Sequence, residues 1–134
     1  MLNQIGHPLY DQREGLGTTQ FVVWTMRQGF IAKHRAALVD YFEDMLRIER
    51  WYLDPKNHDE AAKIAGSLLK IPPERFGWLY GKKDYYRDPD MRPDLAALQR
   101  NVDAVADLGF MKSSFDVKKF SDLSLIEEAK ERLK

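Results

Sequence analysis

Residues 21–26 read Phe-Val-Val-Trp-Thr-Met, and the fold of the chain depends on what this run does. β-Branched and aromatic residues dominate the run, and polar residues and Gly29 bound it, as is typical of a strand buried on both faces. A buried strand needs neighbours in a sheet, but the sequence contains no clear second run of this kind. We therefore expect a fold that is mostly α, with one or two short strands.

After this run the sequence changes to a helical period. Apolar residues recur at spacings of three, four or seven from Phe30 to the pair Asp54-Pro55. The recurring positions are Ile31, Leu38, Phe42, Met45, Ile48 and Tyr52. This pattern predicts a long amphipathic helix that buries these side chains and stops before Pro55.

Further helices are expected downstream because the sequence repeats the signals of helix starts and caps. These signals are Asn57 with Glu60, Pro72-Pro73-Glu74, Pro93-Asp94, Asp116, and Ser124 with Glu127. The helix after Pro93 carries the clearest apolar stripe, and Gly81 is the expected C-cap of the short helix before it. Residues 1–19 are rich in glycine and polar residues and show no such period, so we expect them to be irregular.

Composition limits the possible partners and compartments. The 134 residues include 21 Lys+Arg and 21 Asp+Glu, so a zero formal charge gives no reason to expect nucleic acid or an anionic membrane as a partner. Cysteine is absent, which excludes disulfides and thiolate sites. The first 20 residues lack a basic segment followed by an apolar one. If Met1 is the true start, the chain is expected to be soluble and cytoplasmic.

Five stretches carry a family resemblance. They are Gly17-Thr-Thr-Gln-Phe-Val-Val-Trp24, Phe30-Ile-Ala-Lys-His-Arg-Ala-Ala-Leu-Val39, Lys82-Lys-Asp-Tyr-Tyr-Arg-Asp-Pro-Asp90, the helix from Pro93 to Phe110, and Asp116-Val-Lys-Lys-Phe-Ser-Asp-Leu-Ser124. In order and content they resemble the C-terminal part of periplasmic substrate-binding proteins that serve ABC importers for nitrate, sulfonate, taurine and thiamine precursors. The matching positions are scattered over nearly the whole chain.

The resemblance implies a segment of an α/β fold with two lobes, the type II periplasmic binding-protein fold. Residues 1–19 would be an irregular segment or a remnant of the second lobe, and residues 20–134 the strand and helical part of one lobe. The implied function is solute binding for an importer, without catalysis or a cofactor. A small polar or anionic solute and the membrane permease would be the partners, and the periplasm the location.

The candidate ligand-binding residues are Thr18, Thr19, Gln20 and Trp24, which flank or begin the expected strand. Hydroxyl and amide groups there are suited to donate hydrogen bonds to a polar or anionic ligand in a cleft, and an indole ring to stack on it. The alternatives are that the first three satisfy backbone groups of a turn and that Trp24 fills the core.

Two other classes of function are weighed against solute binding. A self-standing helical module without ligand would bury its exposed apolar faces in a homodimer, or exchange its strand with a second copy. A zinc or iron enzyme is not expected, because His7, His34 and His58 are widely spaced. Only His58 has carboxylates beside it, Asp59 and Glu60, and helix capping explains these acids better. No phosphate loop, nucleophile elbow or metalloprotease motif is present either.

Overall fold

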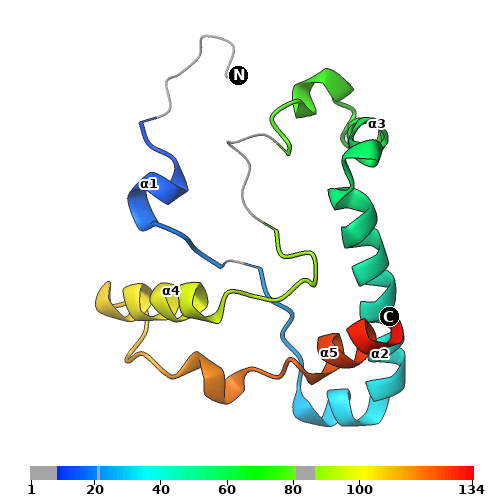
Figure 1. Ribbon diagram of the computed structural model, residues 1–134. Coiled ribbons are helices and arrows are strands. Elements are labelled where there is room, and N and C mark those ends of the chain that lie inside the picture. Colours follow the sequence, from blue (N-terminus) through cyan, green and yellow to red (C-terminus); the bar gives the residue numbers. More distant parts are fainter. Residues whose placement is uncertain (1–8, 21, 81–86) are drawn as a thin grey trace. The chain divides into compact units, whose positions relative to one another are not determined.

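The computed structural model describes residues 9–20, 22–80 and 87–134 (Figure 1). They belong to two compact units, each built from two stretches of chain. The first unit comprises Met1–Thr25 and Pro93–Ser121, and the second comprises Met26–Arg92 and Asp122–Lys134. The expected division at residue 19, into a lobe remnant and the helical part of a lobe, stays a prediction.

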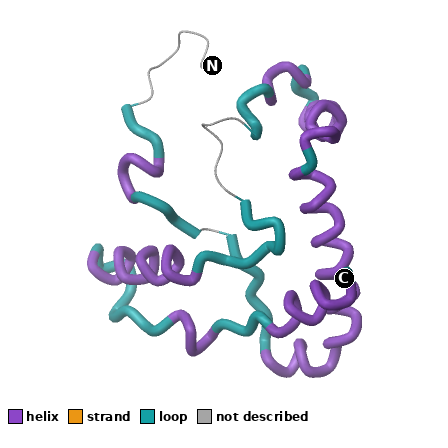
Figure 2. The backbone as a smooth tube through the Cα atoms, in the orientation of Figure 1, coloured by secondary structure: helices purple, strands orange, loops and turns teal. Residues whose placement is uncertain are grey.

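The expected strand is wrong. Residues 22–26 form a loop, and Phe21 lies outside the described residues. Figure 2 shows helices and loops throughout the described ranges and no strand in them. Val22 is 82% exposed and Trp24 60% exposed, so this run is not buried on two faces. Strand formation depends on pairing with neighbouring strands, and the described residues contain none. The expected fold, mostly α with one or two strands and part of an α/β two-lobe protein, is therefore corrected to helices and loops alone in these ranges.

The long helix expected to end before Pro55 is confirmed and belongs to the second unit. This unit contains α2 (Gln28–Leu53), η1 (Pro55–Asn57), α3 (His58–Leu69), η2 (Pro73–Phe76) and α5 (Ser124–Arg132). The backbone of α2 leaves helical geometry at His34, where φ is −119° and ψ 20°, and the helix is kinked there. It ends before Pro55 as expected, and the Asp54 carboxylate accepts a hydrogen bond from the Lys56 amide at 3.0 Å.

The core of the second unit lies between α2 and α5, which run side by side (Figure 1). Val39, Phe42 and Leu46 line one face of α2 because they are three and four residues apart. They pack on α5 against Leu125, Ile126 and Ala129. A helix turns by about 100° per residue, so Ile48 points almost opposite to Leu46. Ile48 is 57% exposed, and its expected place in the core is wrong.

Neither expected capping box of this unit forms. The Asn57 side chain makes no cap of α3; it donates a hydrogen bond to the Trp51 carbonyl at 2.8 Å. The N-cap of α5 is Leu123, and the Asp122 carboxylate accepts from the Ser124 amide at 2.9 Å. At α5 the Asp122 carboxylate thus takes the place of the Glu127 side chain as the acceptor for the Ser124 amide.

The connection from α3 to η2 requires a glycine. A Cβ atom on Gly66 would lie 2.7 Å from the Ile71 carbonyl oxygen, and the Ile71 amide donates to the Gly66 carbonyl at 3.0 Å. Lys70 ends α3 in the left-handed conformation, with φ at 55°. The short helix expected after Pro72 is the 3-10 turn η2, and its expected cap, Gly81, lies outside the described residues.

The first unit contains α1 (Gln12–Leu16), α4 (Leu95–Asp107) and η3 (Val117–Phe120). The Asp94 carboxylate caps α4 by accepting from the Ala97 amide at 2.8 Å, which confirms the expected start. The Asp116 carboxylate accepts from the Lys118 amide at 3.1 Å at the start of η3, again as expected. Helix α1 was not expected, although Asp11 and Glu14 form a capping box at its start.

Of the described helices, α2 is the longest, with 26 residues. About 20 predominantly apolar residues are needed to cross the hydrocarbon core of a bilayer. Charged residues interrupt the apolar ones along α2, and none of the helices in the described ranges is both long and apolar enough to cross a membrane.

Candidate functional site: a pocket beside α4

The predicted ligand residues Thr18, Thr19 and Gln20 come just before the loop at residues 22–26. Two of them, Thr18 and Gln20, form hydrogen bonds with the start and the N-terminal half of α4. The Gln20 side-chain oxygen accepts from the Asp94 amide at 2.9 Å, and its main-chain oxygen accepts from the Asn101 side chain at 2.8 Å. The Thr18 carbonyl accepts from the Arg100 guanidinium at 3.0 Å. Contacts of this kind are what the alternative interpretation describes, in which these residues satisfy backbone groups and do not bind a ligand.

The other two candidates lie apart from these contacts. The Thr19 hydroxyl accepts a hydrogen bond from the Gln12 side chain of α1. Trp24 is 60% exposed, so it does not fill a core in this chain. None of the four candidates lines the pocket of the first unit, and their role in ligand binding stays a prediction.

The pocket lies on the surface between α4 and the segment that leads into η3, and it has a volume of about 800 Å³. It is open to solvent on one side. Its lining residues are Leu95, Ala96, Gln99, Arg100, Ser114, Phe115, Asp116 and Lys118. The first four belong to one face of α4, and the others come from a segment that returns across this face.

Gln99 holds the two walls of the pocket together. Its side-chain oxygen accepts from the Val117 amide at 2.8 Å, and its amide nitrogen donates to the Phe115 carbonyl and the Asp103 carboxylate at 2.9 Å each. Ser114 donates a further hydrogen bond to Asp103. The bonds from Ser114 and Gln99 lower the pKa of Asp103, so this carboxylate stays ionised as an acceptor. Val117 itself is buried. The polar groups that join the two walls of the pocket thus have their hydrogen-bond partners within the protein.

Two cations at the pocket are available to a ligand. Within the described ranges neither Arg100 nor Lys118 forms an ion pair, and Arg100 uses one guanidinium nitrogen on the Thr18 carbonyl. Leu95 and the ring of Phe115, which is 43% exposed, give the pocket an apolar part. Asp116 also lines the pocket, and its carboxylate already accepts from the Lys118 amide. A ligand with a negative charge and a small apolar part could contact the two cations with its charge and the apolar side chains with the rest.

The sequence did not predict this pocket. The apolar stripe of the helix after Pro93 predicts which face is buried, but it assigns no role to the polar face with Gln99 and Arg100. Lys118 follows an expected cap, but nothing in the spacing of residues 99–118 says that the chain returns over α4. The cap at Asp116 was the one local signal that a turn forms near the pocket.

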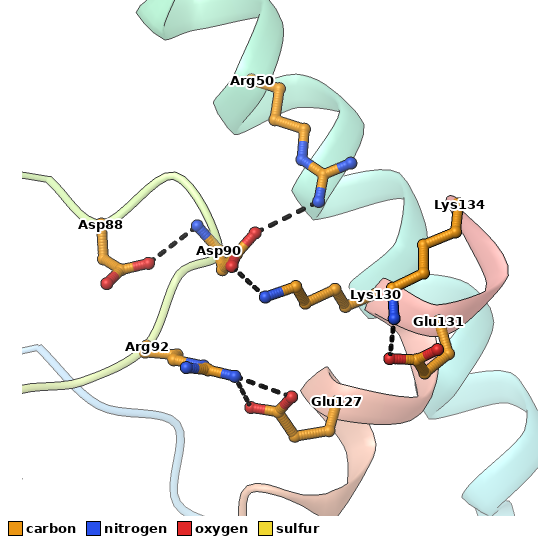
Figure 3. A network of polar contacts seen from close by, with 8 residues as sticks. All are labelled: Arg50, Asp88, Asp90, Arg92, Glu127, Lys130, Glu131 and Lys134. Carbon is orange, nitrogen blue, oxygen red and sulfur yellow. Dashed lines mark hydrogen bonds and ion pairs between the residues drawn. The ribbon is translucent and has the colours of Figure 1, made fainter.

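A second polar cluster lies in the second unit (Figure 3), and its charged groups are paired with one another. The Asp90 carboxylate accepts from Arg50 of α2 at 3.2 Å and from Lys130 of α5. Arg92 pairs with Glu127 of α5 at 2.6 Å. The hydrogen bond from Lys130 is the main cause that lowers the pKa of Asp90. We name Asp90, Arg50, Lys130, Arg92 and Glu127 the clasp, because they hold residues 88–92 on α2 and α5.

The described histidines, His34 and His58, belong to no group of potential metal ligands. His34 lies at the kink of α2, and His58 stacks on Tyr80 with ring centroids 3.4 Å apart. His7 lies outside the described residues. No group of three or more potential metal ligands occurs in the part of the chain that the structure describes.

Comparison with known proteins finds no match for this chain among family models, curated proteins or solved structures.

Proposed function

We propose that this chain binds a small organic anion and acts as the non-catalytic solute-binding component of an ABC-type importer. The observation that carries the proposal is the pocket beside α4, where Arg100 and Lys118 flank an apolar wall. Two cations without an ion-pair partner in the described ranges attract negative charge. The volume of about 800 Å³ lies within the range of roughly 300–1,000 Å³ that is usual for ligand pockets.

The residues of the pocket favour a sulfonate or carboxylate on a short organic body. The guanidinium of Arg100 has donors left beside the one that binds Thr18, and such a group matches the oxygens of these anions. Lys118 adds a mobile point charge on the opposite wall. Leu95 and Phe115 offer contact to methylene groups. Because the pocket is open to solvent, we expect this chain to bind the anion weakly by itself.

The role in an importer is supported by the sequence resemblance of residues 17–24, 30–39, 82–90 and 116–124 to substrate-binding proteins for sulfonates, taurine, nitrate and thiamine precursors. In that role the chain would meet a permease and work in the periplasm. Those proteins take up small polar or anionic solutes, and this is the class of ligand that the residues of the pocket favour. The resemblance and the pocket are independent reasons for the same proposal.

The binding half of the proposal is tested with ethanesulfonate as the probe. Its affinity is measured by ligand-observed NMR at low ionic strength, with the uncharged ethyl methyl sulfone for comparison. We expect ethanesulfonate to bind and the sulfone not to bind. Losing one charged hydrogen-bonding partner costs about 1.5–3 kcal/mol, so Arg100→Gln and Lys118→Gln should each weaken binding by about tenfold or more.

The matched control is Lys119→Gln, which removes an equal charge from the next residue along the chain, outside the lining of the pocket. We expect this variant to bind ethanesulfonate as the unmodified chain does. Equal affinity in all four proteins, or equal binding of the sulfone, would contradict the proposal.

A further inference from the structure

α2 carries a second apolar stripe on the face opposite the core. Residues 37, 41, 44, 48 and 51 follow an alternating spacing of four and three, and we name them the outer stripe; they are Ala37, Tyr41, Asp44, Ile48 and Trp51. Tyr41 is 40% exposed, Ile48 57% and Trp51 37%. At about 100° per residue these positions fall within one narrow band, on the side away from Val39, Phe42 and Leu46.

The shape of the outer stripe fits another helix. An alternating spacing of four and three is the seam of a coiled coil, where side chains of one helix enter the spaces between those of another. The outer stripe begins after the kink at His34, so it runs along the part of α2 with regular helical geometry. The occupant is therefore a helix with a matching seam, and α2 of a second copy has that seam by identity.

We propose that the outer stripes of two copies of this chain pack against each other in antiparallel orientation. In a parallel pair, Asp44 would face the Asp44 of the second copy, and two carboxylates would meet in the seam. Like charges placed opposite each other across an interface oppose association. The antiparallel register in which facing residue numbers sum to 85 separates them, because Asp44 then faces Tyr41 of the second copy. This inference does not depend on the anion pocket, which belongs to the other unit.

The antiparallel register is complementary in size and in charge. Ala37 faces Ile48 of the second copy, so a small side chain meets a large one, and Tyr41 faces Asp44. Along the edge of the seam, Asp40 and Arg47 come to flank each other across the pair. Asp40 is 68% exposed and Arg47 58%, although each also has a partner within its own chain. Opposite charges at flanking positions set the orientation of paired helices.

The available area suits a weak dimer. A large side chain presents ~200 Å² when fully exposed, so the exposed parts of Tyr41 and Ile48, which face outer-stripe residues of the second copy in this register, offer ~200 Å² of apolar surface per copy. A small specific interface buries roughly 500–600 Å² per partner, of which a little over half is apolar. The outer stripe thus supplies most of the apolar area that such an interface needs. We expect association in the micromolar range, visible as a mass that rises with concentration.

Sedimentation equilibrium over a concentration series tests the dimer. Ile48→Lys places a charge in the outer stripe, and we expect it to weaken association at least tenfold. Ile64→Lys is the matched control, because Ile64 of α3 is 47% exposed and lies outside the outer stripe. This variant should associate as the unmodified chain does, and circular dichroism verifies that both variants are folded. A monomer mass at every concentration, or equal effects of the two substitutions, would overturn the proposal.

The orientation is tested by disulfide cross-linking, which has no background because the chain contains no cysteine. Under mild oxidation, Ala37→Cys and Ile48→Cys should each fail to cross-link alone and should form a mixed disulfide dimer when combined. A parallel pair would give the opposite pattern, with each variant cross-linking to itself. That result, or a failure to cross-link in all three samples, would overturn the antiparallel register.

Discussion

Leu46→Ala tests the packing of α2 on α5 most sharply, because Leu46 and Ile48 are close in sequence and differ completely in environment. Leu46 is 0% exposed and packs in the core with Val39 and Phe42, whereas Ile48 is 57% exposed. Removing three buried carbons leaves a cavity that the helices fill only in part. We expect Leu46→Ala to lower the free energy of unfolding by about 3 kcal/mol, within the range of roughly 2–5 kcal/mol for such changes.

The control is Ile48→Ala, for which we expect a loss of no more than about 0.5 kcal/mol, as is usual at exposed positions. Both variants are unfolded with urea and followed by circular dichroism, at a protein concentration low enough to keep the chain monomeric. Equal losses at the two positions would refute the orientation of α2, and a larger loss at Ile48 would favour the core that the sequence pattern predicted.

Two further changes probe the second unit. Asp90→Asn removes the negative charge that Arg50 and Lys130 share, and we expect a loss of up to about 1 kcal/mol at neutral pH by urea unfolding. Because the pKa of Asp90 is lowered on folding, its contribution is present above the ordinary carboxyl range and is lost as pH falls through the folded pKa. The difference in the free energy of unfolding between the unmodified chain and Asp90→Asn should therefore disappear in acid. A difference that does not change with pH would argue against the clasp. Gly66→Ala should lower stability by about 1–3 kcal/mol in a thermal melt, because its Cβ would overlap the Ile71 carbonyl; an unchanged melt would contradict this close approach.

The features that were predicted correctly depend on nearby residues. Asp94 and Asp116 cap α4 and η3 because a carboxylate reaches amides two or three residues ahead whatever the rest of the chain does. The end of α2 before Pro55 is local in the same sense. The α-helices other than α1 could therefore be found from the sequence, to within a few residues.

The features that were missed depend on residues far apart in the chain. The run at residues 21–26 has the composition of a strand, but no pairing partner lies in the described ranges. Ile48 fits the helical period of the predicted core, but the position of α5 decides which face of α2 is buried. Arg100 and Lys118 come together only because residues 114–118 return over α4, held by Gln99. Local spacing does not report such contacts.

The central claim, that the pocket beside α4 binds a small organic anion, is tested most directly by mapping where ethanesulfonate acts on the ¹⁵N-labelled chain. Backbone amide shifts are recorded during a titration. We expect saturable shift changes confined to residues 95–100 and 114–118. These changes should be smaller at physiological salt, because salt screens exposed charges. Shifts that never saturate, or that centre on α2, α3 or α5, would contradict the assignment of the site.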